Sequence, residues 1–596
     1  MGIQANPRGS PKGNSSFFLY CILFILYRTF IAFTERGAES PDEWWQSAEV
    51  AYFLVFKKGQ VTWEWRDGIR SIFFPSLFAA PYYVLKLLKV DSAWTIYIAE
   101  RLVQTVIASS IDICTLTLAW RLDAALTEGK ESTGASDTAE DKKRSGDAKK
   151  GSSLLRPSVL SNTAMLLFFH WYLGYTSTRS YSNVAECLFF MLALLQDSYA
   201  PFLFFAGVAC MVRVTALLAL LPLFVFHVVD ILRQKGTVRG LIQVVITGLV
   251  MVAIILKLLV GIDYIFYQRL ILTPYNFFYT NIFLEVSKYY GVYPWSYYFL
   301  VSFPITTGFS VVLLALLPHA VAGQRISARA RRLVGRLFVT LFSTIFLNSF
   351  VAHKENRFLF LLLPINVVLC AFVLAVLARG MARARLPLIG LAVPLVLVKL
   401  LVEVLFAIGV FLFVFFGYTY RTGTLSLMAY IRHSPHVYQQ LDVMTCCYAS
   451  PGYSQVHRKV EHLELNDCPM ILDPETKKRE LYADLLYRKA PVLYLNWRYT
   501  RSPALYKSEA AQRELFDSVD DSLTPEEFWP LAKKLFPENE PVVLPDGLMI
   551  FTNVADALKE TVLLPNGYVL ETRARHAFVL FEPHEDLFID LWRRTI

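Results

Sequence analysis

The sequence predicts a polytopic α-helical membrane protein that ends in a mixed polar domain. Of the 596 residues, 55% are hydrophobic and only 18% are charged, which is more apolar content than one soluble core needs. Apolar runs long enough to cross a hydrocarbon core about 30 Å thick recur along the chain. After Gly417 the composition changes to mixed polar and apolar residues with strand-like runs, which are typical of a small α/β domain.

The first predicted span covers Phe17–Phe33 and follows a polar tail that carries Arg8 and Lys12. No small-x-small cleavage site follows this run, so we interpret it as an uncleaved anchor. The positive-inside tendency then places the tail in the cytosol and the next stretch in the lumen of the secretory pathway. The net charge of +9 comes mostly from basic loops and needs no nucleic acid to explain it.

Basic clusters predict the sidedness of the remaining segments. Residues 127–157, rich in Gly, Ser, Asp and Lys, are expected to form a disordered cytosolic linker. The basic loops at 233–239, 325–336 and 379–385 are expected on the same side, which gives about eleven spans in total. The expected organisation is a cytosolic tail (1–16), a first span, luminal loop and second span (17–126), the linker (127–157), the remaining transmembrane core (158–416) and a luminal C-terminal domain (417–596).

Two apolar runs depart from a simple spanning helix. The run Ile72–Leu88 is interrupted by Pro75 and Pro81, so we expect a luminal interfacial or re-entrant helix. The run Phe202–Val229 is unusually long and contains Arg213, which is costly inside a membrane. We expect two short helices that break at Arg213 on the luminal side; one tilted helix with a snorkelling arginine is the alternative.

The predicted topology brings three polar stretches to the luminal face. They are Asp42 with Glu43, Thr62–Ser71 and His353–Phe358. Aromatic side chains there could hold a sugar, cations could neutralise a phosphate, and a carboxylate could take a proton from a hydroxyl group. An aromatic belt and anchoring charges at the membrane interface are the structural alternative, but an acidic pair has no anchoring role.

The cysteine pattern and the acidic residues give no sign of a metal site. The sequence contains no C-x-x-C pair and no D-x-D pair, so neither a zinc site nor a metal bridge to a nucleotide sugar is indicated. Cys446, Cys447 and Cys468 fall in the predicted luminal domain, where a disulfide is chemically allowed. Which of the three cysteines pair stays open.

Three stretches together resemble the signature segments of a glycosyltransferase family. They read "PDEWWQSAEVAYFLVFKKGQVTWEWRDGIRS", "TRSYSNVAE" and "HKENRFLFLLLP". The family includes the dolichyl-phosphate-mannose-dependent α-mannosyltransferases of the endoplasmic reticulum. Within it, "GTLSLMAYIRHSP" and "MTCCYASPGYSQVH" are similar to the branch that adds the third mannose of the glycosylphosphatidylinositol (GPI) core. The resemblance runs from about Thr34 to His457.

The resemblance implies a GT-C fold with a luminal active site and a lipid-phosphate sugar donor. The implied reaction is an inverting α-1,2 transfer of mannose from dolichyl phosphate mannose to the second mannose of the GPI precursor. Both partners, the donor and the acceptor, are lipids. The resemblance further implies a multi-pass protein of the endoplasmic reticulum membrane. No cofactor or metal is expected.

The resemblance also implies roles for particular residues. Asp42 matches the family's luminal-loop carboxylate and is expected to be the general base, with Glu43 as its competitor. The residues expected to bind the donor phosphate are Lys354, Arg357, Arg213 and His353. The residues expected to contact sugar or support the loop are Trp63, Glu64, Trp65, Arg70 and Glu355.

Two departures from the family pattern limit what can be carried over. Tyr293 and Ser296 stand where the family usually has histidines, and Tyr448 follows a Cys-Cys pair where relatives usually have one cysteine and a histidine.

Two alternative functions stay open. One is a sister enzyme that acts on the fourth GPI mannose or the dolichol-linked N-glycan precursor, and the other is a non-catalytic lipid transporter or scaffold.

Overall fold

The computed structural model divides the chain into two compact units, which are described separately. The described residues are 11–131, 157–322, 326–379, 394–469, 482–502, 514–515, 523–582 and 585–595. The helical unit comprises residues 1–33, 70–74 and 102–413, and the mixed unit comprises residues 34–69, 75–101 and 414–596. The helices α6 (Ala93–Glu131) and α19 (Leu395–Tyr418) therefore each begin in one unit and end in the other.

The helical unit has the lengths and composition of a polytopic membrane protein. Within the described ranges, six stretches are long and apolar enough to cross a membrane, and a helix pair bent by 111° between Thr306 and Ser310 would make seven. The long helices are α1 (Pro11–Thr34), α6 (Ala93–Glu131), α12 (Ala216–Lys235), α13 (Thr237–Tyr267), α18 (Leu363–Ala378, preceded by the 3-10 turn Asn356–Leu362) and α19 (Leu395–Tyr418).

Shorter helices fill the space between the long ones. Residues Leu363–Leu377 of α18 are all buried, so α18 lies in the core of the unit, whereas α13 is mostly exposed, as expected of a lipid-facing helix. The shorter helices are α8 (Val159–Phe169), α9 (Trp171–Ser177), α10 (Ser182–Leu194), α11 (Tyr199–Val212), α14 (Thr273–Phe278), α15 (Phe303–Thr306), α16 (Leu317–Ala322) and α17 (Ala328–Ser349).

The structure confirms the helix break predicted at Arg213. Helix α11 ends at Val212, and α12 begins at Ala216, so the apolar run is two helices. Helix α5 (Phe73–Leu87) has Pro81 inside it and, at 15 residues, is shorter than the membrane-length helices.

Some predicted boundaries move, and others fall outside the described residues. Helix α6 begins at Ala93 and continues to Glu131, five residues into the predicted linker 127–157. Most of that linker, the first part of the N-terminal tail and the basic loop at 379–385 apart from Arg379 lie outside the described residues. Helix α19 begins at Leu395, and the predicted start of its span at Leu388 also lies outside them.

The mixed unit contains the α/β fold predicted for the C-terminal segment. Its sheet has five strands in the order β2-β1-β3-β5-β4. The pairs β1–β2 and β1–β3 are parallel, and β5 pairs antiparallel with both β3 and β4. The strands are β1 (Tyr438–Met444), β2 (Val460–Leu465), β3 (Gly547–Phe551), β4 (Tyr568–Arg575) and β5 (Phe588–Arg594).

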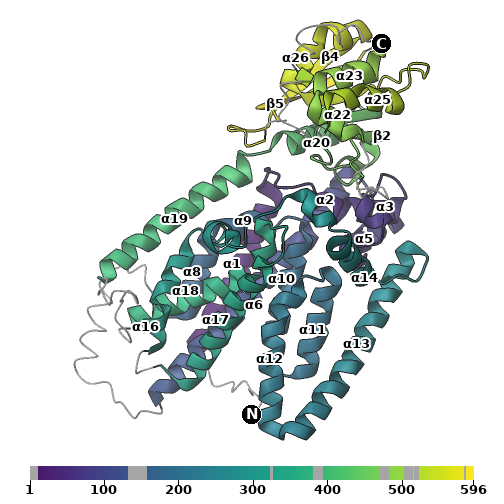
Figure 1. Ribbon diagram of the computed structural model, residues 1–596. Coiled ribbons are helices and arrows are strands. Elements are labelled where there is room, and N and C mark those ends of the chain that lie inside the picture. Colours follow the sequence, from purple (N-terminus) through teal and green to yellow (C-terminus); the bar gives the residue numbers. More distant parts are fainter. Residues whose placement is uncertain are drawn as a thin grey trace. The chain divides into compact units, whose positions relative to one another are not determined.

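Helices of this unit come from both ends of the chain. Trp44 and Trp45, which follow the first span, belong to the same buried core as Leu427 and Met428 of α20 and the sheet residues of the C-terminal segment. Figure 1 shows the C-terminal helices in green to yellow and α2 and α3 in purple. The helices are α2 (Asp42–Trp45), α3 (Ala48–Phe56), α4 (Trp63–Arg66), α20 (Gly423–His433), α21 (Tyr453–Val456), α22 (Ala483–Lys489), α23 (Pro491–Thr500), α25 (Pro525–Leu535) and α26 (Thr552–Leu558).

Candidate functional site

The predicted base and its competitor lie in α2, a single helical turn. Pro41 precedes this turn with φ −51°, and proline favours the start of a helix because its φ is already helical. Asp42 is half-buried, whereas Glu43 is 1% exposed. The Ser47 hydroxyl donates to the Glu43 carbonyl at 2.8 Å, just beyond the end of the turn. The two adjacent carboxylates therefore differ in their access to solvent.

The indole hydrogen bonds of two buried tryptophans fix α2 in place. The Trp45 indole N–H donates to the Ser450 carbonyl at 3.1 Å, and the Trp65 indole N–H donates to the Trp45 carbonyl at 3.1 Å. Trp65 therefore supports the turn that carries the carboxylates. Trp63 and Glu64, on the same helix α4, are half-buried, and sugar contact stays a prediction for both.

Glu43 belongs to a group of buried charged residues whose charges act on one another. The group includes Glu100 and Arg101, 1% and 5% exposed, near the start of α6. The Gln455 amide donates to Glu100 Oε2 at 2.7 Å. Glu43 is thus held among charges inside the mixed unit, while Asp42 reaches the surface.

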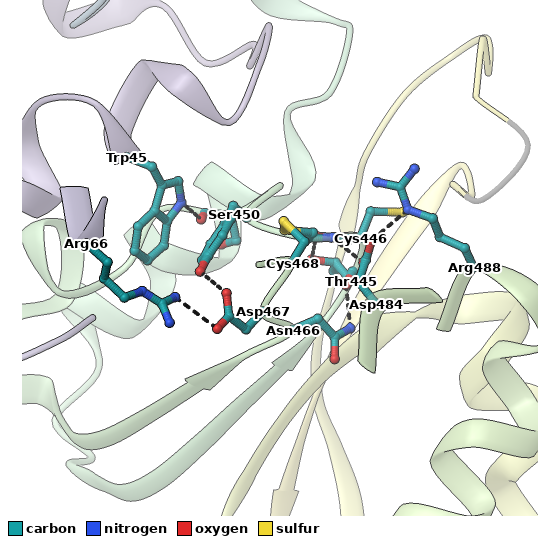
Figure 2. Close-up of a disulfide and its surroundings, with 12 residues drawn as sticks. Trp45, Arg66, Thr445, Cys446, Ser450, Asn466, Asp467, Cys468, Asp484 and Arg488 are labelled. Carbon is teal, nitrogen blue, oxygen red and sulfur yellow. Dashed lines mark hydrogen bonds and ion pairs between the residues drawn. A yellow bond between two sulfur atoms is a disulfide. The ribbon is translucent and has the colours of Figure 1, made fainter. Parts of the chain in front are cut away.

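An aromatic contact next to a disulfide joins the C-terminal segment to α2. Cys447 and Cys468 form the disulfide, and Cys446 is a free thiol (Figure 2). Tyr448, which follows Cys447, places its ring 4.5 Å from that of Trp45. Its hydroxyl donates to Asp467, which also accepts from Arg66 Nη2 of α4 at 3.1 Å.

Glu49 fixes a second part of the C-terminal segment to α3. Its carboxylate accepts from the Gly452 N–H at 2.8 Å, the Ser454 N–H at 3.1 Å and the Ser454 hydroxyl at 2.6 Å. Burial raises the pKa of Glu49 to about 7, although these hydrogen bonds act in the opposite direction. Sequence reasoning missed Glu49, Glu100 and Arg101, and the only available signal was charge within apolar surroundings.

In the helical unit, two predicted cations form an arginine cluster with two carboxylates. Arg213 lies at the break between α11 and α12, with its Nε 3.3 Å from Glu186 Oε2 and its Nη1 donating to the Ser182 hydroxyl at 3.1 Å. Arg357 donates through Nε to Glu355 Oε2 at 2.6 Å. Arg70, Arg357 and Glu355 also act electrostatically on Arg213. Glu186, on α10, was part of a quoted motif but was not predicted as a site residue.

The remaining two predicted phosphate ligands are bonded to backbone carbonyl groups. Lys354 is 3% exposed, and its ammonium donates to the carbonyls of Tyr293 and Val351. His353 is hydrogen-bonded through Nδ1 to the Gly291 carbonyl and through Nε2 to Glu355, each at 3.0 Å. In these contacts both side chains fix the 291–293 loop. Ser296 lies further along the same segment, at the turn before Tyr298.

Electrostatics favour charged forms of Glu355 and His353. Burial acts to raise the pKa of Glu355, but Arg357 and the hydrogen bond from His353 outweigh it and lower the pKa well below the ordinary value. Burial acts to lower the pKa of His353, but the hydrogen bonds to Glu355 and Gly291 outweigh it and raise the pKa. No three His, Cys, Asp or Glu side chains in the described part of the chain gather as a metal site would require.

The fold and these clusters define a class of protein, a polytopic helical membrane protein with a mixed-sheet domain, a group of buried charged residues and an arginine–carboxylate cluster. A family model described as the Alg9-like mannosyltransferase family matches residues 19–457. The chain belongs to this family and is therefore a mannosyltransferase.

Curated relatives match over most of the chain. The chain is 34% identical to "GPI mannosyltransferase 3" of Trypanosoma brucei brucei strain 927/4 GUTat10.1, over 96% of this chain and 98% of the relative. It is 27% identical to human "GPI alpha-1,2-mannosyltransferase 3", over 83% of this chain and 78% of the relative. A crystal structure of ArnT from Cupriavidus metallidurans bound to undecaprenyl phosphate matches at 11% identity and a TM-score of 0.46, covering 96% and 97% of the two chains. That structural likeness is too low to support an argument.

Proposed function

We propose that this protein transfers mannose from dolichyl phosphate mannose, in α-1,2 linkage, to the second mannose of the GPI precursor. The observation that carries the proposal is the similarity to GPI mannosyltransferase 3 along almost the whole length of both chains. We propose the endoplasmic reticulum membrane as its location, with the lipid donor and the GPI glycolipid acceptor as its partners. The proposed reaction adds the third mannose of the GPI core.

An inverting transfer needs a base on the acceptor hydroxyl and a group that stabilises the departing phosphate, but no enzyme nucleophile. Asp42 takes the proton of the mannose 2-hydroxyl as the anomeric carbon forms its new bond. The exposure of the two carboxylates supports this choice, because Asp42 is half-buried and Glu43 is almost fully buried beside Glu100 and Arg101. Glu43 then keeps the turn α2 in place.

Arg213 and Arg357 are the proposed ligands of the dolichyl phosphate leaving group. Guanidinium groups donate several hydrogen bonds in a fixed plane and suit phosphate oxygens. Glu186 and Glu355 orient the two guanidinium groups through their Nε atoms. Lys354 and His353 act by holding the 291–293 loop, which the carbonyl contacts of both side chains support.

We propose a GT-C architecture of about eleven spans. By length and composition, six long helices and one bent pair would supply seven of them, and three further predicted spans fall on the shorter apolar helices α8, α10 and α11. The last is α17, which has 22 residues and carries basic residues in its first turns.

The experiment analyses GPI precursors in cells that lack this protein, by mass spectrometry and linkage analysis. The proposal expects a precursor with two mannoses to accumulate and the wild-type chain to relieve it. Asp42→Asn is expected to leave the block in place at normal expression, whereas Asp42→Glu keeps a carboxylate and is expected to retain some transfer. A three-mannose precursor or a truncated dolichol oligosaccharide would instead identify a sister enzyme, and no accumulation would favour a transporter or scaffold.

The role of Asp42 is tested separately with purified protein. Loss of a general base lowers the rate by about a hundredfold or more. An Asp42→Asn protein that keeps a tenth of the wild-type activity would exclude Asp42 as the base without touching the acceptor assignment.

A further inference from the structure

The connection between β4 and β5 exposes four consecutive apolar side chains. Phe578, Val579, Leu580 and Phe581 have exposed fractions of 57%, 49%, 37% and 61%. A run of this kind is uncommon on a soluble surface, where large apolar patches mark contacts with proteins or membranes. We call residues 577–582 the apolar loop.

The apolar loop is held by a hydrogen-bonded base. The N–H groups of His576 and Ala577 both donate to the Leu587 carbonyl, at 2.7 and 3.3 Å, so the two ends of the connection are closed on each other. Arg421 Nε lies 2.8 Å from Glu585 Oε1, and the Thr422 N–H donates to the His576 carbonyl at 2.8 Å. The described base of the connection is therefore held by the chain just beyond α19.

These contacts place the apolar loop beside the end of a predicted membrane span. The span in α19 ends at Tyr418, and the Tyr420 ring lies 5.3 Å from the Phe581 ring in an edge-to-face contact. The same Tyr420 ring lies 5.6 Å from Phe416 and 6.2 Å from Phe415. A continuous row of aromatic rings thus runs, within the mixed unit, from the last turn of the span to the apolar loop.

We propose that the apolar loop inserts into the bilayer interface, in the leaflet at which α19 ends. Aromatic side chains prefer the headgroup level, and an apolar segment with a basic edge binds there without spanning the membrane. The Arg575 guanidinium, 4.3 Å from the centre of the Phe578 ring, supplies such an edge, because a long basic side chain keeps its charge among headgroups while its stem covers apolar surface. The mixed unit is then attached to the membrane by this loop as well as by its covalent links to the spans.

Two variants, each with one introduced cysteine, test the proposal in the full-length protein. Phe581→Cys places a thiol in the apolar loop. Val543→Cys is the matched control, an apolar residue that is 62% exposed on the same unit. Val543 lies near Asp546, whose carbonyl accepts from the Arg594 N–H at the far end of β5, about 20 Å along that strand from the apolar loop. The six free cysteines of the described residues are buried or half-buried, and labelling of the wild-type chain measures their background.

Each variant is labelled with an environment-sensitive fluorophore and reconstituted into phosphatidylcholine vesicles, with and without a nitroxide on the acyl chain. We expect the label at position 581 to emit at shorter wavelength and to lose intensity in nitroxide vesicles, and the label at 543 to do neither. Equal water-like emission at both positions would overturn the proposal. So would a shielded label at 581 that nitroxide lipids do not quench, which would identify a second copy or a protein partner as the occupant.

The wild-type chain provides a test that does not depend on how the variants fold. Vesicles that contain a phosphatidylcholine with a photoactivatable carbene precursor are illuminated, and the attached lipid is mapped by peptide mass spectrometry. We expect adducts on the peptide with Phe578 and Phe581 and none on the peptide with Val543. Adducts absent from both peptides, while the exposed helix α13 is labelled, would overturn the proposal.

Discussion

The rings of Trp45 and Tyr448 lie 4.5 Å apart at an angle of 44° between their planes. This contact joins α2, which carries Asp42 and Glu43, to the residue that follows the Cys447–Cys468 disulfide. Tyr448 stands where relatives usually have histidine, and no role could be carried over to it from the sequence. The structure gives it one, as a support of α2.

Tyr448→Ala is expected to lower the rate of transfer, and Tyr448→Phe is expected to preserve most of it. Phenylalanine keeps the ring contact with Trp45, which is worth about 0.5–1.5 kcal/mol, and loses only the hydrogen bond to Asp467. The measurement is kcat and KM for mannosyl transfer by purified variants. If the alanine variant melts like the wild type and keeps its kcat, the contact does not position α2.

Removing the disulfide is expected to destabilise the mixed unit. Cys447 and Cys468 are 21 residues apart, and a disulfide that closes a loop of about this length stabilises by about 3 kcal/mol. We expect Cys447→Ser to lower the melting temperature in detergent. Cys446→Ser is the control, because Cys446 is a free, half-buried neighbour and its loss leaves the disulfide intact. Equal melting temperatures for the two variants would contradict the prediction.

Glu49 is expected to make stability depend on pH. Its pKa is about 7 in the folded protein and 4.5 as an ordinary value, so between these values the folded state holds a proton that the unfolded state has released. Stability from this group is therefore greatest below pH 4.5, falls as the pH rises through this window and levels off above pH 7. A shift of this size corresponds to about 3 kcal/mol.

The measurement compares the melting temperatures of the wild type and Glu49→Gln between pH 5 and pH 8. Glutamine keeps a carbonyl oxygen for the Gly452 and Ser454 donors and does not titrate. Other titrating groups are common to both proteins, so the difference between their pH profiles reports Glu49 alone. Parallel profiles would show that Glu49 keeps an ordinary pKa.

Glu186→Gln is expected to weaken the use of the lipid donor. The substitution removes the negative charge 3.3 Å from Arg213 Nε, and breaking a buried ion pair by removing one partner costs about 3–5 kcal/mol. We expect kcat/KM for the donor to fall about tenfold or more, while KM for the acceptor stays unchanged. Thr215→Val is the control, since it removes only a 3.4 Å contact to the same carboxylate. A uniform loss of activity that follows the melting temperature would indicate a structural role only.

The sequence predicted those features that depend on local pattern. The charge at Arg213 inside an apolar run predicted the helix break, and the strand-like runs after Gly417 predicted the sheet. The sequence could not show that Lys354 donates to a backbone carbonyl, because the path of the 291–293 loop sets this contact. The partners of Glu49 lie more than 400 residues away and meet it only through tertiary packing, with sequence separations of 403 and 405.

The assembly of the mixed unit from distant segments has a consequence for the synthesis of the protein. Residues 34–101 leave the ribosome about 300 residues before the segment that begins at Val414, a delay of roughly 15–60 s at ordinary elongation rates. During this interval Trp44 and Trp45 lack the core in which they are later buried. We therefore expect the nascent chain to need protection of these side chains until its last third arrives, and a premature stop before Gly417 to leave them exposed.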